Sequence, residues 1–221
     1  LLLGGGRVID PAQGLDATRD ILIRDGRITA MEPSLSGHPQ AASAHWVNAS
    51  GLVVTPGLVD VHVHFREPGQ TSKETIATGA RCAARGGFTA VVCMPNTKPA
   101  IDDAAVVGLV RDRARQQAWA RVYVAGAITE DLGGERLAPI GALHRAGVVA
   151  ITDDGRCVQN SEVMRRALEY ARMYDLPVMD HCQDYALVSE GVMHEGYWSA
   201  VLGLRGWPAI GEDAIVGRNI Q

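Results

Sequence analysis

Short apolar runs recur about every 30 residues from residue 58 onward, which is the length of a strand–helix–strand unit. There are five of them, at residues 58–64, 89–94, 121–126, 148–152 and 177–181. Strands that are buried on both faces need near-continuous apolar sequence of this kind. We therefore predict an α/β fold in which parallel strands alternate with helices.

The segments between these runs carry helix-end signals. The sequence Thr-Ser-Lys-Glu at 71–74 predicts a capping box that opens a helix, and Gly-Gly at 86–87 closes it. Residues 102–103 and 160–161 are candidate N-caps of two further helices. Successive βα units suit either a doubly wound sheet or most of an eight-stranded barrel. Because no glycine-rich phosphate loop follows the first run, we predict five βα units of a partial (β/α)8 barrel of the TIM type.

Residues 7–54 have a different pattern, of short strands joined by turns. Asp25-Gly26 between two apolar runs is a strong signal for a two-residue hairpin, and residues 46–49 are a further candidate strand. This segment has too little apolar mass to fold alone. We predict part of a small β-sandwich domain at 1–54 and the amino-terminal part of a barrel at 55–221.

Composition argues against several classes of protein. The net charge is −4, and acidic and basic residues are scattered, so neither a nucleic-acid surface nor a membrane surface is expected. No apolar run reaches the roughly 18 residues of a membrane helix, and the first residues lack a signal-peptide pattern. The four cysteines lack paired spacing, which indicates reduced thiols in a cytoplasmic protein. Because the chain lacks an initial Met and ends within a predicted helix, we expect a fragment.

The first apolar run also carries polar residues in alternation. Asp60, His62, His64 and Arg66 share one parity, and a strand points such residues to one face. Two histidines at i and i+2 near a strand end can bind one metal ion together. An isolated His-x-His is more often the polar face of a half-buried strand, so the choice depends on the other strand ends.

Those other ends are polar as well. Asp153-Asp154 follows the fourth run and His181 ends the fifth, and in a barrel such ends meet at the carboxyl face. We predict His62, His64, Asp154 and His181 as metal ligands, with Asp153 as the competitor of Asp154. A carboxylate that bridges two ions gives each an N/O environment suited to zinc, and such a pair activates water and polarises a carbonyl.

Arg66 and Asn96 are predicted to flank this site without binding metal. A planar guanidinium suits a substrate carboxylate, and the amide of Asn96, after the second run, adds a donor. The alternative for Arg66 is a surface ion pair with Glu67. The remaining histidines are expected to be solvated: His38, His45, His144 and His194.

At these residues the chain resembles the dihydroorotases, the cyclic-amide hydrolases of pyrimidine synthesis in the amidohydrolase superfamily. The likeness spans nearly the whole chain, and its motifs are specific in combination. The matching segments are 56–69, 86–89, 94–99, 152–155, 180–182 and 202–209.

The resemblance implies that His62 and His64 bind one zinc ion, that Asp154 bridges to a second, and that His181 serves the second. It implies that His64, Arg66 and Asn96 bind dihydroorotate or N-carbamoyl-aspartate. Related dihydropyrimidinases and allantoinases bridge their metals with a carboxylated Lys. Here the Asp-Asp-Gly sequence takes that place, as in the longer bacterial dihydroorotases.

The resemblance also sets limits. The family's last metal His and its general-base Asp are expected beyond Gln221, so no catalytic residue is predicted within this chain. Gln183 stands where an acidic residue is expected. The rival predictions are a hydantoinase or allantoinase, and a non-catalytic scaffold for aspartate transcarbamoylase. Candidate partners are a small-molecule substrate, aspartate transcarbamoylase and further copies of the chain, without nucleic acid or membrane.

Overall fold

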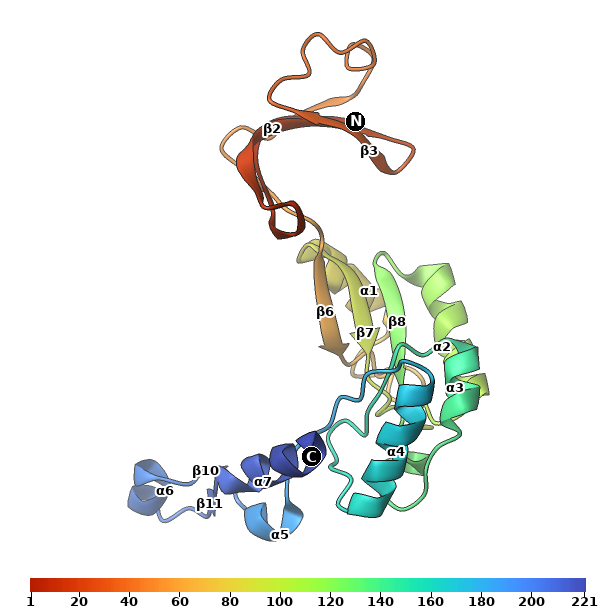
Figure 1. Cartoon of the computed structure of the whole chain (residues 1–221), viewed down its shortest axis with the longest axis vertical. Coiled ribbons are helices and arrows are strands. Elements are labelled where there is room, and N and C mark those ends of the chain that lie inside the picture. Colours follow the sequence, from red (N-terminus) through yellow and green to blue (C-terminus); the bar gives the residue numbers. More distant parts are fainter. The chain divides into compact units, whose positions relative to one another are not determined.

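The computed structural model describes residues 1–221, which form two compact units, Leu1–Gly57 and Leu58–Gln221 (Figure 1). The first unit is one five-stranded sheet in which β1 is central, pairing with β2, β4 and β5, while β3 pairs with β2. A second sheet that would complete a sandwich stays a prediction. The strands are β1 (Leu2–Asp10), β2 (Leu15–Arg24), β3 (Arg27–Glu32), β4 (Trp46–Asn48) and β5 (Val53–Val54), with a 3-10 turn at Pro11–Gln13.

The predicted hairpin at Asp25-Gly26 is confirmed. Arg24 pairs with Arg27 across a two-residue turn, and both turn residues have positive φ, 49° for Asp25 and 73° for Gly26. Two successive left-handed residues give the turn the twist that antiparallel strands require.

The second unit is built on a parallel sheet in the order β6-β7-β8-β9. Helices α1 to α4 follow these strands in turn, and α2 and α3 lie along the same side of the sheet (Figure 1). An α/β fold with parallel strands is therefore confirmed. The elements are β6 (Leu58–Val63), α1 (Ile76–Arg85), β7 (Phe88–Cys93), α2 (Ala104–Gln117), β8 (Arg121–Gly126), a 3-10 turn (Glu130–Leu132), α3 (Ile140–Ala146), β9 (Ala150–Ile151) and α4 (Ser161–Met173).

The main core lies between the sheet and these helices. Val91 of β7, Val124 of β8 and Ile151 of β9 are at most 1% exposed and pack among side chains of the helices. A smaller apolar cluster, which includes Val92 and Ala125, lies on neighbouring positions of the same strands. Since successive strand residues point to opposite faces, the two clusters mark the two faces of the sheet.

Two of the three predicted helix starts are confirmed, and one is wrong. Asp103 caps α2 and Asn160 caps α4, each accepting two backbone N–H groups. The capping box lies at Thr75 and Thr78 rather than at 71–74. Residues before Thr75 turn instead, since the Lys73 N–H bonds the carbonyl of Gln70.

The fifth predicted strand, 177–181, is wrong as a regular strand. Val178 forms an isolated bridge with Ile151, and the strand predicted at 148–152 is reduced to β9. Pro177 has no N–H to donate to a ladder. The next residues form no further bridge, and the Asp180 carboxylate accepts a hydrogen bond from Asn219.

The chain ends in short elements around α7. None of the helices in the structure is both long enough and apolar enough to cross a membrane. These last elements are α5 (Tyr185–Val188), β10 (Met193–His194), α6 (Tyr197–Leu202), β11 (Gly206–Trp207) and α7 (Ile210–Ile220), with β10 and β11 paired in parallel.

Candidate metal centre

Strand β6 and the residues that follow it supply the histidine pair. Phe65 turns into the main core at 5% exposure, which leaves His62 and His64 on the opposite parity. The two imidazole rings stand edge to face with their centroids 5.2 Å apart. Val59 and Val61 share the parity of Phe65 but are more than half exposed in this unit.

Asp154 meets the two imidazoles from the turn after β9. Its Oδ1 lies 2.9 Å from His62 Nε2, and its Oδ2 lies 3.5 Å from His64 Nε2. Gly155, with φ +78°, turns the chain directly after it. At 8% exposure the carboxylate is buried, so it needs charged or hydrogen-bonding partners.

The donor set fits a divalent metal ion. One ligand atom from each of His62, His64 and Asp154 lies within 4.8 Å of the others. Two imidazole nitrogens and a carboxylate oxygen are a typical zinc set that leaves a fourth position open. No other group of three His, Cys, Asp or Glu side chains in the chain has this spacing.

His181 does not belong to this group. Its Nε2 lies 3.0 Å from Gln183 Oε1. His181 lies three residues beyond Val178, which forms the single bridge of this segment. The assignment of His181 as a ligand of a second ion stays a prediction. Gln183 is the residue that stands where an acidic side chain was expected.

Asn96 and Arg66 adjoin the three clustered side chains. The Asn96 Nδ2 donates to Asp154 Oδ2 at 2.6 Å, and Asn96 Oδ1 lies 3.0 Å from His64 Nδ1. Arg66 Nη1 lies 3.5 Å from the same Asn96 oxygen. Asn96 therefore contacts two candidate metal ligands, which the sequence did not indicate.

Comparison with known proteins gives the family. A family model described as dihydro-orotase-like matches residues 51–220. The chain belongs to the dihydroorotase-like family. It is 51% identical over 220 residues to a dihydroorotase of Citrifermentans bemidjiense, covering 100% of this chain and 51% of that protein. It is 53% identical over 220 residues to a dihydroorotase of Anaeromyxobacter sp. strain K, covering 100% of this chain and 50% of that protein.

The dihydroorotase-like chain spans about half the length of the curated relatives it matches. Its fold is similar to that of the L-hydantoinase from Arthrobacter aurescens, with a TM-score of 0.76 and 18% identity. That match covers 98% of this chain and 49% of the hydantoinase. A D-hydantoinase from Bacillus sp. AR9 gives a TM-score of 0.71 at 20% identity, over 99% of this chain and 48% of that one. At this level of identity the likeness shows the fold.

Asp153 anchors the Asp-Asp-Gly turn of this dihydroorotase-like chain to the loop after β8. It is 1% exposed, and its Oδ1 accepts the backbone N–H groups of Ile128 at 2.7 Å and Thr129 at 3.0 Å. The Thr129 hydroxyl donates to Oδ2. Burial raises the pKa of the Asp153 carboxyl, while these hydrogen bonds oppose the rise. The carboxylate is thus occupied by the loop after β8, which favours Asp154 as the residue that faces the histidines.

A second anchor, missed by the sequence reasoning, holds the residue before His181. Asp180 Oδ2 accepts from Asn219 Nδ2 at 2.6 Å and lies 3.7 Å from Arg218 Nη2. Arg218 Nη1 also donates to the carbonyls of Val158 and Gln159. Helix α7 is thereby tied to the segment that carries His181. Asp180 lies within the fifth apolar run, but nothing in the sequence indicated its partners 38 and 39 residues later.

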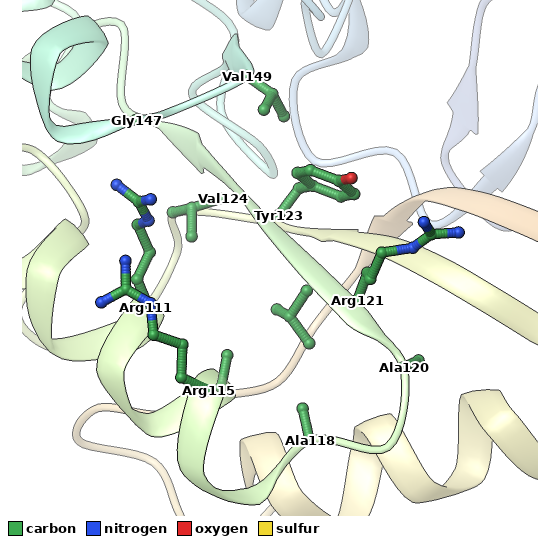
Figure 2. A pocket seen from close by; sticks show the side chains of 11 residues that line it. Arg111, Arg115, Ala118, Ala120, Arg121, Tyr123, Val124, Gly147 and Val149 are labelled. Atoms are coloured by element: carbon green, nitrogen blue, oxygen red, sulfur yellow. The ribbon is translucent and has the colours of Figure 1, made fainter. Parts of the chain in front are cut away.

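A separate hollow of about 460 Å³ lies along β8, beside α2 and Gly147 (Figure 2). It contains none of the predicted site residues. Figure 2 shows Arg111 and Arg115 on one side of the strand, and Arg121 and Tyr123 on the other. Arg111 Nη1 is engaged by the Ala146 carbonyl and Arg115 by Asp112, so the guanidinium groups do not converge on one anion position.

Proposed function

We propose that this chain is the amino-terminal half of a zinc-dependent dihydroorotase. The whole protein would interconvert dihydroorotate and N-carbamoyl-aspartate in pyrimidine synthesis, consuming one water in the hydrolytic direction. The observation that carries the proposal is the convergence of His62, His64 and Asp154 in a chain about half identical to proteins named dihydroorotase.

In this proposal His62, His64 and Asp154 hold zinc, and His181 serves a second zinc ion. Bound zinc would supply a Lewis acid and lower the pKa of a water molecule. The side chains of the site orient the reactants around it. The buried Asp154 carboxylate carries the negative charge that compensates a cation in this position.

The substrate carboxylate is assigned to His64, Arg66 and Asn96. The Arg66 guanidinium offers paired N–H donors that match a carboxylate, and its Nη1 already lies 3.5 Å from Asn96 Oδ1. The general base is assigned to an Asp that follows Gln221 in the whole protein. The same proposal includes an eight-stranded barrel that closes around these residues in the whole protein. It also includes a cytoplasmic location and association with aspartate transcarbamoylase or with further copies of the chain.

The test uses the whole protein that contains this chain, purified with zinc. We expect turnover of dihydroorotate to exceed turnover of hydantoin, since hydantoin lacks the ring carboxylate that Arg66 and Asn96 would bind. A chelator should abolish the activity and added zinc should restore it. His62→Ala should lose both zinc and activity, whereas His45→Ala, an exposed histidine of the first unit, should retain both.

Two results would overturn the proposal in different ways. A preference for hydantoin would assign the protein to the hydantoinases. A zinc-free, inactive protein that still assembles with aspartate transcarbamoylase would assign it a scaffold function.

A further inference from the structure

The side-chain amide of Asn96 links two candidate metal ligands that come from different strand ends. Its Nδ2 lies 2.6 Å from Asp154 Oδ2, and its Oδ1 lies 3.0 Å from His64 Nδ1. The backbone carbonyl of Asn96 accepts from Gln70 Nε2 at 3.3 Å, so the residue is also held from behind.

The contact with Asp154 determines which way the amide faces. An ionised carboxylate only accepts hydrogen bonds, so the atom 2.6 Å from Asp154 Oδ2 has to be the NH₂ group. The reversed amide would set two oxygens against each other at that distance. Asn96 Oδ1 therefore faces His64 Nδ1.

The orientation of the amide in turn determines the tautomer of His64. A carbonyl oxygen only accepts, so His64 Nδ1 has to carry a proton and donate it to Asn96. In a neutral imidazole the other nitrogen then holds the lone pair. That nitrogen, Nε2, is the one that lies 3.5 Å from Asp154 Oδ2 and faces the candidate metal position.

We propose that Asn96 is a positioning residue for the metal centre: it sets the Nδ1–H tautomer of His64 and holds Asp154 Oδ2. The inference rests on the proposed function only in naming zinc as the ion. It deepens that proposal, because Asn96 was assigned to the substrate alone.

The two roles of Asn96 are compatible. An amide NH₂ has two hydrogens, and one of them is used on Asp154 Oδ2. The second contact, to the Asp154 backbone carbonyl, is long at 3.5 Å. That hydrogen is thus available to a substrate carboxylate while Asn96 continues to hold both ligands.

The experiment uses the whole protein with ¹⁵N-labelled histidine, and compares wild type with Asn96→Ala and with the isosteric Asn96→Asp. In the metal-free wild type, the ¹⁵N shifts of the His64 ring, assigned with His64→Gln, should report the Nδ1–H tautomer. In Asn96→Ala the ring should populate both tautomers, and zinc affinity should fall by about 10- to 100-fold, as for loss of other groups that orient metal ligands. In Asn96→Asp a carboxylate oxygen can still accept from His64 Nδ1, so the tautomer should be kept. No NH₂ group remains to donate to Asp154 Oδ2, so zinc affinity should fall.

The matched control is Asn48→Ala, the same change at an exposed residue of the first unit, which should leave zinc affinity and the His64 shifts unchanged. An Nε2–H tautomer in the wild type would overturn the inference. So would an Asn96→Ala variant with wild-type shifts and zinc affinity in which only the KM for dihydroorotate rises. If Asn96→Ala does not fold, the zinc affinity of Asn96→Asp and the His64 tautomer of the wild type still test the inference. Failure of the proposed function would look different, with intact tautomer control in a protein that does not turn over dihydroorotate.

Discussion

Replacing Gly79 by alanine has two opposite effects on stability: alanine favours the helix, but its Cβ clashes with Phe65. Gly79 is buried within α1, and a Cβ there would lie 2.4 Å from both Cδ1 and Cε1 of Phe65. Carbon atoms in contact prefer about 3.5–4.0 Å, so the ring or the helix would have to move by roughly 1 Å. Gly108 in α2 is the matched control, because a Cβ there meets nothing within 4 Å.

The magnitudes favour the clash. Alanine in place of glycine in a helix interior contributes roughly 0.5–1 kcal/mol of stability. Overpacking a filled core costs about 1–3 kcal/mol. We therefore expect Gly79→Ala to lower the unfolding free energy by about 1 kcal/mol and Gly108→Ala to raise it by about 0.5–1 kcal/mol.

Urea unfolding of the whole protein measures both variants, with the slope m checked for constancy. In a Phe65→Leu background the ring is gone, so Gly79→Ala should become neutral or stabilising there. A Gly79→Ala protein as stable as Gly108→Ala in the wild-type background would refute the reasoning. It would mean that α1 and the segment after β6 adjust to each other without strain.

Three further outcomes are expected. Asp103→Ala removes the acceptor of the Ala105 and Val106 N–H groups and should lower the unfolding free energy by about 1 kcal/mol. Asp103→Asn keeps an acceptor oxygen and should retain most of the capping stabilisation. Burial raises the pKa of Cys93 to about 12, so Cys93 should resist a disulfide reagent at pH 8 that labels exposed Cys82; equal labelling in the native protein would contradict this. Arg218→Met leaves the 7%-exposed Asp180 side chain without its guanidinium neighbour. It should destabilise by about 2 kcal/mol and speed amide exchange in α7, whereas unchanged exchange would mean that the anchor is unimportant.

Local signals predicted much of the fold. The Asp25-Gly26 hairpin and the caps at Asp103 and Asn160 were found because each depends on a few neighbouring residues. The βα repeat was found because parallel strands with both faces covered need continuous apolar sequence. These interactions are encoded within about ten residues, which a sequence displays directly.

Elements that depend on distant contacts were not predictable in the same way. The glycines at 4–6 argue against a strand, yet β1 includes them and is central to its sheet. The structure gives the reason, because a Cβ on Gly4 would lie 2.5 Å from Trp46 Nε1 and one on Gly6 would lie 2.8 Å from Val54. The strand predicted at 177–181 is the converse case: its apolar residues satisfy the pattern, but only Val178 forms a bridge, and Asp180 accepts a hydrogen bond from Asn219 of α7.

The candidate site, too, has a part that the sequence predicts and a part that depends on distant contacts. The meeting of His62, His64 and Asp154 follows from topology, since parallel strands bring their carboxyl ends to one edge. The function of Asn96 within that group depends on one amide rotation and on a contact with a residue 58 positions away. Strand order predicts which residues come near each other, but the proton position on His64 depends on which of two amide atoms faces Asp154. For this reason the tautomer of a histidine in a candidate metal site requires coordinates, even where the choice of candidate residues does not.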